Sequence, residues 1–393
     1  MEKQVFDSLK TTAEEFGSTA KKVNESSKLR KIHSQEALNV IDKSIEIGAV
    51  LEEDLESVAK ANAEMRKQDN VVLNACIILK RNIDKQKDLI NEIKKGKSIK
   101  LEIIDRCLDK INRLSKDVDE AIENINKIVE MDNKMIFMDK EIIMRKQLQQ
   151  SSLRMLNEIT TMSLHDAEKA IEGSSSNLER GLNMVGRLKN VEKMAGKDNL
   201  SELEDLLKCA NSGWNIAINV NNSSTSQYKF AEEVNQFTRQ LHKDSSSIMD
   251  MVARKHGIFE DNLQIVTVLT VIISLKFKKY LDIEEIIENL EFKEDILDVL
   301  NQFIIDVKIA CNDIRDLNAL NYDMADASHL NSEVEDKTVK ATKKELEFFD
   351  KIKKEVEEMT EATKYPIEGS NMNILNGKKL EENLIKIINE IKK

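Results

Sequence analysis

The stretch "VLNACIILKRNIDKQKDLINEI", residues 72–93, decides the fold class. Its apolar residues recur at alternating spacings of four and three, and only Gln86 interrupts the series. This 3.5-residue period is typical of helices that pack along a narrow apolar seam, as in a coiled coil. One polar residue in such a seam costs stability but fixes the register of the helices. We therefore expect a long helix that packs against specific partners.

Two further runs repeat this pattern, and each contains one polar interruption. The first covers residues 101–129, with Ser115 as its polar member, and the second covers residues 286–314, with Lys293. Three such runs favour antiparallel packing between long helices. The predicted core of the seams comprises Val72, Leu79, Ile83, Leu101, Ile104, Leu108, Ile111, Ile122, Ile125, Leu297, Leu300 and Ile304.

The composition leaves little room for turns. The 393 residues include one proline and 11 glycines, whereas an average chain of this length has roughly 20 and 27. Charged residues make up 33% of the chain and aromatic residues only 4%, so aliphatic side chains must form the core. The sequence predicts an all-α protein, an elongated antiparallel helical bundle or coiled coil with long helices and short turns.

Four segments are expected along the chain. Residues 1–172 should form a long helical hairpin that turns within "KKGKS", residues 94–98. Residues 173–227 should form a less regular region of short helices and loops, either a tip or a hinge, because they are rich in Gly, Ser and Asn. Residues 228–365 should form a second set of long helices. Pro366 should end the last of them, leaving a linker and a short amphipathic helix over 366–393.

The irregular region is divided by four expected breaks. They fall in "GSSSN" (173–177), "MAGKDNLSE" (194–202), "NSGWN" (211–215) and "NVNNSSTSQ" (219–227). Trp214, the only tryptophan, lies in the third. It is a candidate contact tip, since Trp suits recognition surfaces. The alternative is that Trp214 fills the end of the bundle.

The most apolar stretch, "NLQIVTVLTVIISL" at 262–275, has 14 residues without a charge. A membrane-spanning helix needs about 20, so we interpret the stretch as a buried helix segment. A membrane-inserting segment of a helical pore-forming toxin is the alternative. The net charge of −11 argues against binding to nucleic acid or to an anionic membrane, because both require a basic surface.

Four cysteines, Cys76, Cys107, Cys209 and Cys311, show no C-x-x-C spacing. They are interpreted as small buried apolar residues of a reducing compartment. The first ten residues, "MEKQVFDSLK", lack the apolar segment of a secretory signal. We therefore expect a cytoplasmic protein.

No motif in the sequence supports catalysis. The five histidines are scattered, and neither H-E-x-x-H nor G-x-S-x-G occurs. The sequence therefore predicts neither an enzyme nor a cofactor, catalytic or metal site.

The segment "TTAEEFGSTAKKV", residues 11–23, pairs Glu14 and Glu15 with the small residues that follow them. It resembles the cytoplasmic helical region of methyl-accepting chemotaxis proteins, and "AEEVNQFTRQLHKDSSSIMDMV" at 231–252 has a similar texture. The resemblance implies methylation of Glu14 or Glu15 and a signalling rod made of paired helical hairpins. No stretch resembles the kinase-binding tip of that family.

These observations lead to three functional hypotheses. The first is a non-enzymatic cytoplasmic scaffold that forms a homo-oligomer or filament through its helices, with a helical protein as a further candidate partner. The second is a soluble chemoreceptor-like signalling rod. The third is a helical pore-forming toxin component that uses residues 262–275.

Overall fold

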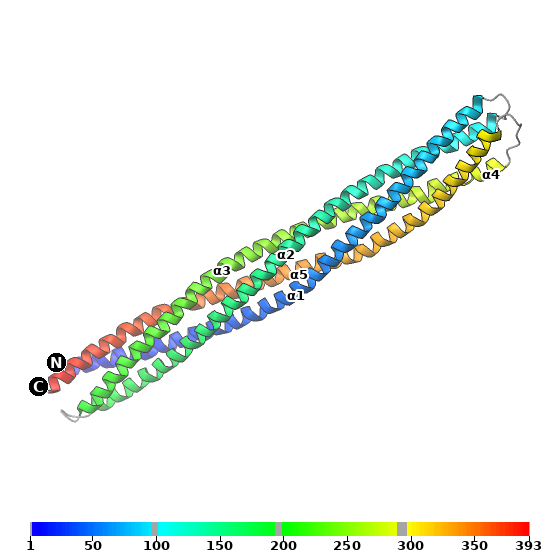
Figure 1. Ribbon diagram of the computed structural model, residues 1–393. Helices are drawn as coiled ribbons and strands as arrows, with labels where there is room; N and C mark the ends of the chain where they lie inside the picture. Colours follow the sequence, from blue (N-terminus) through cyan, green and yellow to red (C-terminus); the bar gives the residue numbers. More distant parts are fainter. Residues whose placement is uncertain (1, 96–100, 193–198, 289–296, 393) are drawn as a thin grey trace. The chain divides into compact units, whose positions relative to one another are not determined.

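The protein is an all-α helical bundle (Figure 1). A computed structural model describes residues 2–95, 101–192, 199–288 and 297–392, although not the side chains of residues 2, 3 and 101. Four long helices account for most of these residues: α1 (Glu2–Lys95), α2 (Leu101–Val191), α3 (Leu200–Val271) and α5 (Leu297–Lys392). A π-helical turn, η2 (Ile272–Lys276), a 3₁₀ turn, η3 (Phe277–Tyr280), and the short helix α4 (Ile283–Glu288) follow α3.

The helices divide into two compact units. Unit 1 comprises residues 1–49, 148–246 and 344–393, and unit 2 comprises residues 50–147 and 247–343. Within each unit, α1 and α3 run antiparallel to α2 and α5. In unit 2, for example, Asn62 of α1 contacts Asn331 of α5, while Asn82, further along α1, contacts Asp313, which is earlier in α5. Unit 1 contains both the beginning of α1 and the end of α5, which lie side by side (Figure 1).

Buried positions follow the 3.5-residue period without interruption along each long helix. In α1 they alternate at spacings of four and three from Leu9 to Ile93, and in α2 from Ile104 to Val191. The same alternation extends from Leu203 to Ile273 and from Leu300 to Leu384. The seams are therefore much longer than the three apolar runs, because Ser, Thr, Asn, Gln and charged residues occupy many of their buried positions.

The predicted core positions fall into three groups. Those that are buried are Val72, Leu79, Ile83, Ile104, Ile111, Ile125 and Leu300. Leu108, Ile122 and Ile304 are half-buried against the same core, and the side chain of Leu101 lies outside the described residues. Leu297 was predicted wrongly. It is 46% exposed, because the seam of α5 starts at Leu300 and continues through Phe303 and Val307.

Most of the predicted breaks are wrong. Residues 173–177, 211–215 and 219–227 are helical, so residues 173–191 and 200–227 are not an irregular region. In place of the predicted short helices and loops, a single helix of 72 residues begins at Leu200. The turns expected at 94–98 and 194–202 lie largely outside the described residues, but α1 ends at Lys95 and α2 ends at Val191.

Glycine and serine act in unit 1 as packing residues. A Cβ atom on Gly173 would lie 2.5 Å from Val220 Cγ2, and one on Gly181 would lie 2.6 Å from Gly17 Cα. These glycines let neighbouring helices approach closely. Ser174 donates a hydrogen bond to the Ala170 carbonyl within its own helix. Tertiary contacts thus override the weak helix propensity of these residues.

Pro366 does not end α5, which continues to Lys392. A proline lacks an N–H, so the carbonyl four residues earlier loses its helical donor. In unit 1 that carbonyl belongs to Ala362, and Ser26 Oγ of α1 donates to it at 3.0 Å. A neighbouring helix therefore replaces the missing hydrogen bond. The linker and separate C-terminal helix predicted for 366–393 do not form over 366–392.

Candidate functional site

The core of unit 2 contains a buried ion cluster. Lys255 Nζ of α3 lies 2.6 Å from Asp139 Oδ1 of α2 and 2.9 Å from Glu335 Oε1 of α5. All three side chains are at most 1% exposed. Charges are almost never this deeply buried unless they are paired.

Two asparagines connect this cluster to α1. Asn62 Nδ2 donates to Asp139 Oδ2 at 2.8 Å, and Asn331 Nδ2 donates to Asn62 Oδ1 at 2.7 Å. We call these five residues, Asn62, Asp139, Lys255, Asn331 and Glu335, the lysine layer. Because all four long helices contribute to it, the layer specifies how they are aligned.

A second polar group lies one heptad away in the same core. Asp69 of α1, Asp132 of α2 and Asn262 of α3 are each 1% exposed, and Asn262 Nδ2 donates to Asp132 Oδ1 at 2.7 Å. We call these three residues the aspartate layer. Each is seven residues from a member of the lysine layer, a helical rise of about 10 Å.

The two aspartates of this layer interact directly. The pKa of Asp69 is raised to about 10. Burial is the largest cause, and the hydrogen bond to Asp132 and the negative charge of Asp132 act in the same direction. Burial also raises the pKa of Asp132, although Asp69, Asn262 and the charge of Arg66 oppose this. The two layers together hold four buried carboxyl groups against one buried ammonium group.

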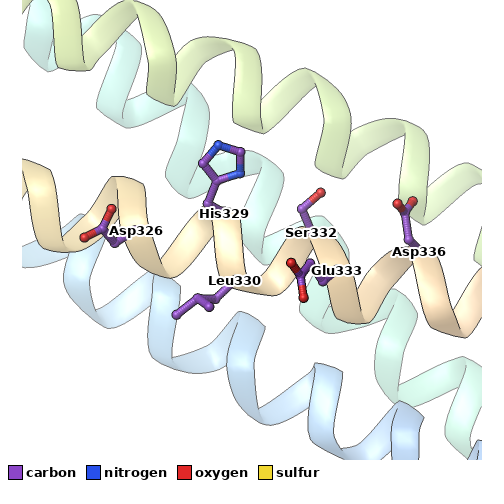
Figure 2. Close-up of a pocket in the computed structure, with 6 residues that line it drawn as sticks. All are labelled: Asp326, His329, Leu330, Ser332, Glu333 and Asp336. Carbon is purple, nitrogen blue, oxygen red and sulfur yellow. The ribbon is translucent and has the colours of Figure 1, made fainter.

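An acidic groove lies on the outer surface of α5 in the same unit. It has a volume of about 690 Å³. All of its lining residues come from α5, and Figure 2 shows His329, Ser332 and Asp336 on the side that faces α3. The lining comprises Asp326, His329, Leu330, Ser332, Glu333 and Asp336. The groove is open and lies at the same level of α5 as Asn331 and Glu335.

Unit 1 contains a different polar core, centred on Arg30 of α1. Arg30 Nη1 donates to the Met359 carbonyl at 2.6 Å and to Thr363 Oγ1. Its Nη2 donates to Ser163 Oγ and to the Gln227 carbonyl, at 3.1 Å from the latter. Burial lowers the pKa of Arg30 to about 9, and the charge of Asp166 opposes the shift. One side chain thus binds the three other long helices, through carbonyls and hydroxyls.

A set of metal-ligating residues also lies in unit 1. His33 Nδ1 of α1 lies 3.1 Å from Glu355 Oε2 and 3.3 Å from Glu358 Oε2 of α5, and 3.8 Å from Glu36 Oε2. His33, Glu36 and Glu355 have the ligand types and spacing that could hold a metal ion. Sequence reasoning missed this set, because Glu355 lies on another helix, 322 residues from His33.

Glu14 and Glu15, the candidate modification sites, are both exposed on α1. They line a groove of about 600 Å³ in unit 1 together with Ser18 and Lys22 of α1 and with residues 372, 375 and 376 of α5. The structure therefore leaves both carboxylates accessible.

Trp214, the candidate contact tip, packs within unit 1. Its Nε1 donates to Glu381 Oε2 at 2.8 Å, and Lys378 Nζ lies 5.3 Å from its ring centroid. A Cβ on Gly377 would lie 2.5 Å from Trp214 Cβ. The indole of Trp214, a residue of α3, thus packs against α5, where Gly377 has no side chain to exclude it. It is not at a tip, and it does not fill the end of the bundle.

The apolar stretch 262–275 is divided between two surroundings. Val266, Leu269, Ile272 and Ile273 are buried in the core of unit 2, whereas Val268, Val271 and Leu275 are exposed. The helical segment Leu200–Glu288 is long and apolar enough to cross a membrane by length and composition, and 33% of its most apolar window is buried.

Three of the cysteines, Cys76, Cys107 and Cys311, are buried, and Cys209 is half-buried. All four are free thiols. Their predicted behaviour as small apolar residues is confirmed for the three that are buried.

The chain matches no family model, and neither any curated protein nor any solved structure matches it. Its function must therefore be argued from its own residues.

Proposed function

We propose that this chain is a non-enzymatic cytoplasmic scaffold protein that self-associates through coiled-coil packing of its helices, with a filament as the extended form. One observation carries the proposal, the unbroken alternation of buried positions along all four long helices. A sustained 3.5-residue period is typical of structural proteins whose helices continue to pack against one another over many heptads.

The polar layers support this role. A buried polar residue lowers stability but discriminates between registers. Both Arg30 and the lysine layer bring together groups from all four long helices. A scaffold whose spacing matters benefits from such alignment.

Apolar side chains on the outer face of α2 provide a surface for self-association. In unit 1, Leu148, Met155 and Met162 are spaced by seven residues and are 63%, 46% and 55% exposed. A stripe with heptad spacing can pack against a helix of a second copy. In unit 2, Phe137 and Met144 are also exposed and seven residues apart.

The test is to measure mass against protein concentration by light scattering and to image the protein by negative staining. We expect oligomers or filaments, and we expect Met155→Lys with Met162→Lys to dissociate them. Thr161→Lys with Asn190→Lys is the matched control, since both residues are exposed on α2 and the added charge is the same. A wild-type monomer at every concentration would refute the proposal.

A chemoreceptor-like signalling function is the second candidate, favoured by the exposure of Glu14 and Glu15 in their groove. Methylation would remove a negative charge beside Lys22 and change how α1 pairs with other helices. Mass spectrometry of the peptide from cells tests this function. A methyl-group increment that Glu14→Gln and Glu15→Gln together abolish is expected, and an unmodified peptide is the contrary result.

A pore-forming function is the third candidate, favoured by the length and apolar character of the helical segment Leu200–Glu288. Dye release from liposomes tests it. Release that Val271→Asp abolishes would support it, since Val271 is an exposed member of the apolar stretch. An absence of dye release at micromolar protein would refute the pore-forming function.

A further inference from the structure

The aspartate layer contains oxygens that lack hydrogen-bond partners. Unless the two carboxyl groups share a proton, these are both carboxyl oxygens of Asp69, Oδ2 of Asp132 and Oδ1 of Asn262. All belong to side chains that are 1% exposed. An unsatisfied buried polar atom destabilises the folded state, and an unsatisfied charged group does so more strongly. Four such atoms in one layer leave it open to a ligand that can satisfy them.

Among the residues that the structure describes, no buried cation is paired with the two carboxyl groups. Lys255, the buried cation of the neighbouring layer, is already paired with Asp139 and Glu335. Arg66 acts on Asp132 only from the surface of α1. On α5 the buried residues one heptad from Asn331 and Glu335 are Met324 and Ser328, and neither carries a charge.

We propose that Asp69, Asp132 and Asn262 bind one divalent metal cation with hard-ligand preference, of the Mg²⁺, Ca²⁺ or Mn²⁺ class. Carboxylate and amide oxygens are the ligands that these ions prefer. Two carboxylates neutralise a doubly charged ion, and the Asn262 oxygen adds a third ligand. This site is independent of the proposed scaffold function.

The neighbouring side chains define the class of ion. Met65, Met135 and Phe259 pack together beside the layer, and these residues supply neither thiolate nor imidazole ligands. Zinc and copper prefer such ligands. The acidic groove on α5, with Asp326, Glu333 and Asp336, raises the local concentration of cations outside the core.

One proton shared by the two aspartates is the competing occupant. A shared proton would neutralise one of the two carboxylates and join one oxygen of Asp69 to one of Asp132, whereas a divalent ion neutralises both carboxylates. The two occupants can be told apart by proton release, because a metal ion that binds here must displace the shared proton. Metal binding at neutral pH must therefore release about one proton per ion.

The experiment uses the full chain after treatment with chelator and dialysis. Mn²⁺ is titrated while the free ion is followed by electron paramagnetic resonance, and proton release is measured in weak buffer. We expect one tight site per chain, a raised thermal midpoint and the release of about one proton. Asp69→Asn and Asp132→Asn should each weaken binding at least tenfold.

The control is Asp109→Asn with Asp298→Asn, which removes exposed carboxylates and should leave the tight site intact. Circular dichroism verifies that each variant is folded. If the aspartate variants fail to fold, proton release by the wild type still decides the question. Absence of a tight site, binding unchanged by Asp69→Asn, or binding without proton release would each overturn the proposal in favour of a shared proton or of surface binding.

Discussion

Replacing glycines of α2 by alanine tests whether they serve close packing. Inside a helix, alanine stabilises the helical state by about 1 kcal/mol relative to glycine. At Gly181 the added Cβ would lie 2.6 Å from Gly17 Cα and 2.9 Å from Gly17 N, which are backbone atoms that cannot move aside cheaply. Overpacking of this kind costs about 1–3 kcal/mol. Gly181→Ala should therefore be neutral or destabilise the protein by up to about 2 kcal/mol.

Two matched variants isolate the packing contribution. A Cβ on Gly186, five residues along the same helix, meets no atom within 4 Å, so Gly186→Ala should gain the full helix propensity. Gly17→Ala places its Cβ 3.6 Å from Gly181, an ordinary contact, so it should also be tolerated. The expected order of stability is Gly186→Ala, then Gly17→Ala, then Gly181→Ala.

Urea unfolding measures this order, as shifts of the midpoint at an unchanged m-value. Gly181→Ala should lie about 1–3 kcal/mol below Gly186→Ala. Equal stabilisation by the two substitutions would refute the close approach of α1 and α2 at these glycines.

Three other perturbations test the polar interior by the same urea assay. Lys255→Met should destabilise the protein by about 3–5 kcal/mol, because it leaves two buried carboxylates without their cation. The control Lys67→Met removes an exposed ion pair and should cost under about 1 kcal/mol. Similar losses of stability in the two variants would contradict the buried pairing. Ser26→Ala should cost about 1–2 kcal/mol, since it removes the donor to the carbonyl that the proline of α5 leaves free, and an unchanged midpoint would contradict that role. The pKa of Asp69 is raised on folding to about 10, so with chelator present its contribution is complete below pH 4 and declines as pH rises towards 10. Asp69→Asn should flatten this decline, and an identical pH profile in both proteins would count against the shift.

The seam could be predicted from sequence where a single apolar phase exists. In residues 72–93 every predicted position is buried, including Gln86, which accepts a hydrogen bond from Tyr280 at 2.6 Å and donates to the Asp306 carbonyl at 2.9 Å. In residues 101–129 neighbouring positions are both apolar, as at Cys107 and Leu108. Periodicity then permits two phases, and packing against the other helices selects Cys107.

The polar layers were missed because the seams were followed only through mostly apolar runs, each with one polar interruption. Lys255 lies three residues after Val252 and four before Phe259, both buried. Extending the 3.5-residue period through polar residues would therefore have indicated it. Its partners could not have been found this way, because Asp139 and Glu335 lie on other helices.

The predicted breaks failed for a related reason. Gly, Ser and Asn have weak helix propensity, and a local reading interprets their clusters as loops. Here Asn24 of α1 donates hydrogen bonds to Ser174 and Ser175 of α2, so the polar residues of one helix stabilise another. Such compensation comes from residues about 150 positions away and is invisible in a sequence window.

The hydrogen bonds of Arg30 also constrain how the protein is made. Arg30 and Thr363 are separated by 333 residues, so the guanidinium cannot complete its contacts until most of the chain has been synthesised. At 5–20 residues per second, translation of that interval takes roughly 17–67 s. During that time the seam of α1 lacks its partner helix α5, and Arg30 lacks the acceptors that α5 supplies. The nascent chain therefore reaches its final helix pairing only at the end of translation.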